Sequence, residues 1–307
     1  MRRYMFSRLA QGLLVIFGAI VISFILTNVI GKPADVIGGP FLPPDQRAAL
    51  NASLGYDEPL VSRFWHYLKG LPTGDFGVSY RTNDGAIHGV LAALPNTLIL
   101  VITAMAISCV AGLALALFSI RWRERLGDRI IRRTIGILQG TPEFWLGLML
   151  ILVFSVGLQW LPSYGFFGGP SLVLPAVALA SPIVPVFFRL FRGQLLDVLR
   201  GDFVEGMRAR GLSEPVIVYN HGLRNIVGRG ATLMALQLGN LIAGDLIIEV
   251  IFSWPGIGNL AFSAVQARDF AVVQAIIVVV AAIYVLLNIA ADLVLVVSDP
   301  RVRSVAS

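Results

Sequence analysis

The stretch LAQGLLVIFGAIVISFILTNVIG, from Leu9 to Gly31, contains 23 residues and no charge. A helix of about 20 largely apolar residues crosses the hydrocarbon core of a bilayer. Three arginines precede the stretch, as in a secretory signal, but it is too long for one and no small-residue cleavage site follows. We therefore expect a retained membrane anchor. In the whole chain 56% of the 307 residues are hydrophobic and 14% are charged, which excludes a soluble protein, a disordered chain and a coiled coil.

Five further apolar runs predict an all-α membrane protein with six transmembrane helices. The second span lies within Gly89–Ile120 and is expected to start near Asn96, after Pro95. The third begins near Thr134, and the uncharged run Phe144–Phe188 is too long for one helix. The turn-rich residues 161–170 divide that run into spans three and four; span five runs roughly from Gly230 to Phe252 and span six from Val272 to Ser298.

The basic residues are distributed unequally between the two sides of this topology. An even number of spans puts both termini on one side, and the segments on that side carry 18 of the 24 basic residues. The positive-inside rule therefore makes both termini cytoplasmic. The densest segment is 121–133, with six arginines, which we interpret as a topology signal and not as a nucleic-acid patch.

Sequence patterns for several kinds of chemistry are absent. The chain has no phosphate-binding loop, no H-E-x-x-H metal site and no G-x-S-x-G nucleophile elbow. Its single cysteine, Cys109, lies in an apolar run, so no internal disulfide or thiolate cluster can form. We therefore predict that the chain is not an enzyme and binds neither a cofactor nor a metal ion.

The segment GDFVEGMRARGLS, residues 201–213, predicts a short helix between spans four and five. Helix-forming residues lie between two glycines, and Gly211 suits a left-handed C-cap. Ser213 could then cap a following helix. A short amphipathic helix held between two spans is suited to transmitting a push.

Glu205, six residues before Gly211, resembles the E-A-A-x-x-x-G loop of ABC importer permeases. The resemblance is sharpest to the B-type subunit of the dipeptide, oligopeptide and nickel branch, and it covers essentially the whole chain in order. Four further motifs carry it: GDFGVS at 74–79, HGLRN at 221–225, FSWPGIG at 252–258, and Asn288, Asp292 and DPR at 299–301.

This resemblance implies the type I ABC importer permease fold and a pump driven by two partner ATPase subunits. ATP and Mg²⁺ would bind to those subunits, whose movement would pass through the coupling segment 197–225 to the spans. The residues that we expect at this contact are Asp202, Glu205, Arg208, Ala209, Arg210 and Gly211.

On the outer side, residues 32–95 and the loop after span five are expected to face a substrate-binding protein. Irregular backbone at membrane depth requires cover by protein or a cavity. We therefore place 252–258 at the external mouth of the path, where it forms either a gate or a simple turn. Asp245 and Glu249 share a helical face and either line the path or anchor helices by hydrogen bonds. Asp292 is expected to pair with a cytoplasmic arginine. The path or gate set is Asp245, Glu249, Trp254, Pro255, Gly256 and Gly258.

The predicted organisation is an N-terminal tail and first span (1–31), an external region (32–95), a five-helix core (96–298) and a cytoplasmic tail (299–307). The resemblance places the chain in the bacterial inner membrane, with a homologous second permease subunit as its partner and no nucleic acid bound. The cargo is a short peptide or, alternatively, nickel or a metal–chelator complex. An intramembrane hydrolase or an ion-driven carrier is a third possibility, which ATP dependence of uptake would discriminate.

Overall fold

The computed structural model describes residues 2–30, 43–53, 57–244 and 246–298. This part of the chain is helical, and its β pairing is limited to an isolated bridge between Val78 and Gly85. The elements are α1 (Arg2–Ile30), α3 (Pro44–Ser53), α4 (Leu60–Gly70), η1 (Leu71–Thr73), α5 (Ala86–Arg121), α6 (Leu126–Gly140), α7 (Glu143–Leu150), η2 (Ile151–Gly157), α8 (Gly169–Ala180), α9 (Val184–Leu199), α10 (Asp202–Ala209), α11 (Glu214–Val216), η3 (Ile217–Gly222), α12 (Leu223–Gly244), α13 (Leu246–Ile251), α14 (Ile257–Gln266) and α15 (Phe270–Ser298).

Three described helices are long and apolar enough to cross a bilayer, so the protein is a multi-pass membrane protein. They are Phe6–Asn28 within α1, Ala86–Arg121 and Phe270–Leu293 within α15. Two bent pairs also qualify if each counts as one span: α6 with α7 and η2, bent by 103°, and α8 with α9, bent by 61°. The described residues thus support three to five spans, and the sixth stays a prediction.

The second span begins earlier than the sequence suggested. Helix α5 starts at Ala86 and carries Pro95 in its interior, so the prediction of a start near Asn96 is wrong. The amide of Ala86 donates to the carbonyl of Gly77 (3.0 Å), and Val90 and Ala93 are buried one and two turns further on. Packing of these turns outweighs the hydrogen bond that proline removes, as is common in membrane helices.

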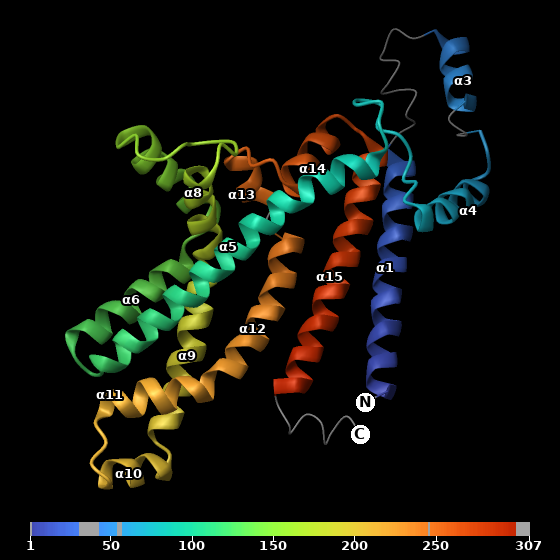
Figure 1. Ribbon diagram of the computed structural model, residues 1–307. Helices are drawn as coiled ribbons and strands as arrows, with labels where there is room; N and C mark the ends of the chain where they lie inside the picture. The colour runs from blue at the N-terminus through green and yellow to red at the C-terminus, as the bar shows by residue number, and fades with distance from the viewer. Residues whose placement is uncertain (1, 31–42, 54–56, 245, 299–307) are drawn as a thin grey trace.

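Figure 1 shows α1 and α15 side by side, with α5 crossing the molecule at a steep tilt. The short helices α10 and α11 lie at the same end as the start of α1 and the end of α15, and α4 and α14 lie at the opposite end. Helix α5 contributes to two apolar cores. One core packs α5 against α8 and α9, and the other packs its first turns against α14 and α15.

The contact between α1 and α15 is fixed at both ends by polar pairs. Arg8 forms an ion pair with Asp292, with 3.0 Å between Nε and Oδ2. Gln274 donates to the hydroxyl of Thr27 (2.5 Å) near the other end. The expected pairing of Asp292 with an arginine is therefore confirmed. Helix α4 packs across α1, where Phe64 meets Phe24 edge to face.

The crossing of α5 and α9 depends on Gly112. A Cβ added at Gly112 would lie 2.5 Å from the Cβ of Phe187 and 3.0 Å from the backbone nitrogen of Phe188. Small residues at helix crossings let backbones approach closely in membrane proteins.

We predict that Gly112→Ala forces α5 and α9 apart and lowers the free energy of unfolding in detergent by about 1–3 kcal/mol, the usual cost of overpacking. The matched control is Gly136→Ala in α6, where an added Cβ meets nothing within 4 Å. The control should be neutral or stabilising because alanine favours helix more than glycine does. Equal unfolding temperatures for the two variants would contradict the prediction.

Candidate functional site

The loop between α13 and α14 is organised by the carboxylate of Glu249, a residue that is only 3% exposed. Its Oε2 accepts hydrogen bonds from the backbone amides of Gly258 (2.6 Å) and Asn259 (3.2 Å). These amides belong to the first turn of α14, whose donors have no partner within the helix. Negative charge is also favourable at a helix N-terminus, so Glu249 acts as a cap from another helix.

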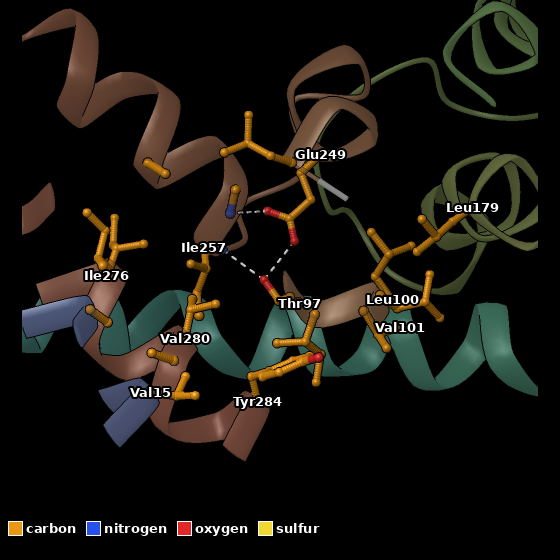
Figure 2. Close-up of a pocket in the computed structure, with 18 residues that line it drawn as sticks. Val15, Thr97, Leu100, Val101, Leu179, Glu249, Ile257, Ile276, Val280 and Tyr284 are labelled. Atoms are coloured by element: carbon orange, nitrogen blue, oxygen red, sulfur yellow. Dashed lines mark hydrogen bonds between the residues drawn. The ribbon is translucent and has the colours of Figure 1, made fainter. Parts of the chain in front are cut away.

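Thr97 of α5 joins this cap from the opposite side. Its hydroxyl donates to Oε1 of Glu249 (2.7 Å) and accepts from the amide of Ile257 (2.8 Å). Figure 2 shows the hydrogen bonds that join the carboxylate of Glu249, the hydroxyl of Thr97 and the backbone amide of Ile257. Three helices, α5, α13 and α14, are therefore tied together by two side chains.

The bend itself is held by Trp254 and Asn96. The indole nitrogen of Trp254, a fully buried residue, donates to the carbonyl of Asn96 (3.0 Å). The side-chain amide of Asn96 donates in return to the carbonyl of Pro255 (2.8 Å). This reciprocal pair holds the 252–258 loop against α5.

Two glycines make room for the carboxylate. A Cβ at Gly256 would collide with the carboxylate of Glu249, and one at Gly258 would lie 2.8 Å from the Cα of Leu246. Neither glycine needs a left-handed backbone, so close approach is the reason for both.

A cavity of about 440 Å³ opens beside this cap. Helices α1, α5, α8, α12, α13, α14 and α15 contribute to its walls, which are apolar apart from Thr97, Glu249 and Tyr284. Figure 2 shows Glu249 and Thr97 at one wall and Tyr284 at another. Because both oxygens of Glu249 are occupied by donors from the protein, this wall is less polar than its composition suggests.

The predicted path or gate residues therefore differ in their surroundings. Glu249, Trp254, Gly256 and Gly258 lie together in the capped loop, and Pro255 is exposed on its surface. Asp245 lies outside the described residues. Glu249 anchors helices by hydrogen bonds, which is one of the two alternatives that the sequence analysis gave for it. A role in the translocation path stays a prediction for the whole set.

The predicted coupling residues lie on and just after α10. Asp202 and Glu205 are in its first turn, Arg208 and Ala209 end it, and all four are exposed. Val204 is fully buried and fixes the helix to the rest of the protein by one side. The opposite side is free to meet another molecule.

The end of α10 has the expected cap. Gly211 has a φ of +79°. Its amide donates to the backbone carbonyl of Arg208 (2.9 Å), and the amide of Leu212 donates to the carbonyl of Met207 (3.2 Å). This is the left-handed C-cap that the sequence predicted. Ser213 occupies the N-cap position of α11 but makes no side-chain cap bond.

An ion pair closes the turn between α10 and α11. Nε of Arg208 lies 2.6 Å from Oε1 of Glu214, and this hydrogen bond raises the pKa of Arg208. The guanidinium group of Arg208 therefore already has a partner within its own chain. Arg210 is exposed at the C-cap position.

Sequence reasoning missed the polar residues that complete these sites. In the sequence analysis Asn96 served only as the start of a span and Thr97 was not singled out, although two polar residues after a proline in an apolar run are a usable signal. A second buried cluster was also missed: Ser119, Asp128 and Arg192 meet where α5, α6 and α9 come together.

Comparison with known proteins matches two family patterns. The pattern described as "Binding-protein-dependent transport system inner membrane component" matches residues 108–304. The pattern of the N-terminal part of such components matches residues 1–101.

Individual relatives point the same way. The chain is 34% identical to the glutathione transport system permease protein GsiC of Escherichia coli (strain K12) over 305 residues, 99% of each chain. Among solved structures, the MetNI methionine ABC transporter aligns with a TM-score of 0.55 at 16% identity, covering 68% of this chain and 96% of that one. An amino acid ABC transporter aligns with a TM-score of 0.50 at 19% identity, covering 69% and 94%. The two structures share the fold.

The Thr97–Glu249 cap makes a testable prediction. Thr97→Val removes the acceptor of the Ile257 amide and a donor to Glu249, and leaving buried polar groups unpaired costs about 1–3 kcal/mol. The unfolding temperature should fall, and hydrogen exchange of the amides at 257–259 should speed up. Thr103→Val on the same helix is the control, because the hydroxyl of Thr103 donates to the carbonyl of Ile99 in its own helix and does not join α5 to the loop. If both variants exchange like the unmodified protein, the cap does not hold the loop.

Proposed function

The chain belongs to the binding-protein-dependent transport system inner membrane components, as an ABC importer permease of the dipeptide and oligopeptide type, and we propose that it imports short peptides. The observation that carries the cargo class is the end-to-end match to a permease named for glutathione, itself a short peptide. A permease subunit transports and does not catalyse. ATP hydrolysis, with its ATP and Mg²⁺, then takes place on two partner ATPase subunits.

The exposed side of α10 is the proposed docking site for an ATPase subunit. The helices on either side of this segment are α9 and the continuous pair η3 and α12, and they are packed closely. An added Cβ at Gly222, the last residue of η3, would lie 3.0 Å from Leu195, and one at Gly230 in α12 would lie 2.8 Å from Phe191. A push on α10 would therefore move the two helices together, as a two-state element.

The distribution of arginines supports a cytoplasmic position for this end of the molecule. Helix α10 lies at the same end as the start of α1 and the end of α15 (Figure 1), and the segments that the sequence assigns to that side carry 18 of the 24 basic residues. The positive-inside rule then supports a cytoplasmic position for α10. The family match and the bacterial relative support a position of the protein in the bacterial inner membrane.

The end of the molecule that carries α14 would face a substrate-binding protein. There the capped 252–258 loop borders the apolar cavity, and we propose that it forms part of the gate. A second, homologous permease subunit would complete the path, because one chain supplies only half of the enclosing helices. Glu249 would act on the gate by holding the loop, since its oxygens already have donors.

The alternative cargo, nickel or a metal–chelator complex, gains no support from the relatives described above. Among the residues that the structure describes, no group of three or more His, Cys, Asp and Glu side chains is arranged to hold a metal ion. A metal complex therefore serves as the comparison cargo in the test.

Uptake measurements test the function directly. The complex of this chain with its partner permease, ATPases and binding protein is reconstituted in liposomes, and uptake of radiolabelled glutathione, a tripeptide and a nickel–chelate is followed with and without ATP. We expect ATP-dependent uptake of the peptides alone. Uptake of the nickel complex alone would make the cargo assignment wrong, and uptake without ATPase subunits would overturn the ABC mechanism.

The coupling site is tested at Gly211. A left-handed backbone costs a residue with a Cβ about 1–2 kcal/mol, so Gly211→Ala should loosen the end of α10 and weaken ATPase co-purification and uptake by roughly tenfold. Gly206→Ala is the control: it lies in the same helix, an added Cβ meets nothing within 4 Å, and the family loop usually has alanine there. If the Gly211 variant keeps the assembly with the ATPase and the uptake of the unmodified protein, the assignment of α10 as the coupling site is wrong.

A further inference from the structure

Helix α6 presents apolar side chains away from the protein. Leu126, Ile130 and Ile137 are 70%, 63% and 71% exposed. Their spacing of four and seven residues places them on one face of the helix. Nothing in the described part of the chain covers this stripe.

A basic stripe runs beside the apolar one. Arg125, Arg129 and Arg133 follow one another at intervals of four residues, and all are exposed. Within the described residues their side chains make no ion pair, whereas Arg132 lies 3.3 Å from the carboxylate of Asp128. Three guanidinium groups are thus available on one edge of the helix.

The buried side of α6 fixes the direction of both stripes. Asp128 is 1% exposed, accepts a hydrogen bond from Ser119 of α5 (2.5 Å) and lies 3.3 Å from Arg192 of α9. Ile135 is buried nearby. Rotation of α6 about its axis would break this pairing, so its outward face is set by the rest of the protein.

The position of α6 matches the edge of a membrane. It starts five residues after Arg121, the last residue of a candidate span, and five residues reach at most about 18 Å. It packs along the C-terminal part of α5 and begins toward the end of the molecule that carries the start of α1 (Figure 1), and it ends in the 103° bend to α7. A helix with adjacent apolar and basic stripes is typical of the membrane interface, where arginine extends its charged end toward the headgroups.

We propose that this face of α6 binds the phosphate headgroups of anionic phospholipids in the leaflet nearest the start of α1. Leu126, Ile130 and Ile137 enter the acyl chains, and Arg125, Arg129 and Arg133 hold the phosphates. Guanidinium groups bind phosphate oxygens in pairs, which favours arginine at such a site. The site goes beyond the transport function and does not depend on it.

The test measures lipid preference without partner subunits. The full chain is reconstituted in phosphatidylcholine vesicles, and electron paramagnetic resonance compares association of spin-labelled phosphatidylglycerol with that of spin-labelled phosphatidylcholine. Each basic residue near an anionic surface contributes roughly fivefold to binding. The triple variant Arg125→Gln, Arg129→Gln, Arg133→Gln should lose most of the preference of the unmodified protein. Circular dichroism checks its folding, and Arg129→Gln alone should lose roughly fivefold.

A charge-matched control separates the site from net charge. Lys69→Gln, Arg81→Gln and Arg268→Gln remove three exposed cations at the end that carries α4 and α14, and this variant should keep the preference. An equal loss in both triple variants would overturn the proposal, and so would displacement of the lipid by millimolar inorganic phosphate. An unchanged lipid preference with loss of ATPase co-purification in the α6 variant would assign the face to a protein partner instead.

Discussion

Backbone amides that lie away from water need partners inside the protein, and this requirement decides how the chain passes from α13 to α14. The sequence FSWPGIG cannot continue a helix, so the amides of Ile257, Gly258 and Asn259 begin a new one without partners of their own. Thr97 and Glu249 supply those partners, and each buried amide left unpaired would cost about 1–3 kcal/mol. The position of α14, and with it one wall of the apolar cavity, therefore follows from one carboxylate and one hydroxyl.

Local features of this fold could be predicted from the sequence, whereas contacts between distant residues could not. Uncharged runs predicted α1 and α15, and the glycine pattern predicted the left-handed cap at Gly211, because each depends on residues close together in the chain. The start of α5 was misplaced because the rule that proline ends a helix is local, while the packing of Val90 that overrides it is not. The bond between Thr97 and Glu249 joins residues 152 positions apart, and a single sequence contains no signal for it.

The buried cluster of Ser119, Asp128 and Arg192 has a different kind of importance. A buried ion pair often adds little net stability, because desolvation offsets the attraction between the charges. Removing one member, however, leaves a buried charge alone and costs roughly 3–5 kcal/mol. The cluster therefore contributes more to the relative positions of α5, α6 and α9 than to the net stability of the fold. It fixes α9 against α5 and α6 about two turns before the end of α9, and a hydrogen bond from Arg189 to Gln139 supports the same contact.

Helix α5 joins the two polar clusters. Thr97 and Ser119 lie about 33 Å apart along it at 1.5 Å per residue, and each is bonded to helices that α5 must carry with it. A continuous helix anchored at both ends does not shorten or bend easily, so a change of shape has to occur elsewhere. The breaks at 141–142 and at 181–183, where the paired helices bend by 103° and 61°, interrupt the helical hydrogen bonding and can absorb such a change. Because Arg192 ties α9 to α5 and α6, we expect a push on α10 to move these three helices as one unit about the two breaks, which changes the cavity beside Glu249 without breaking the cap that holds α14.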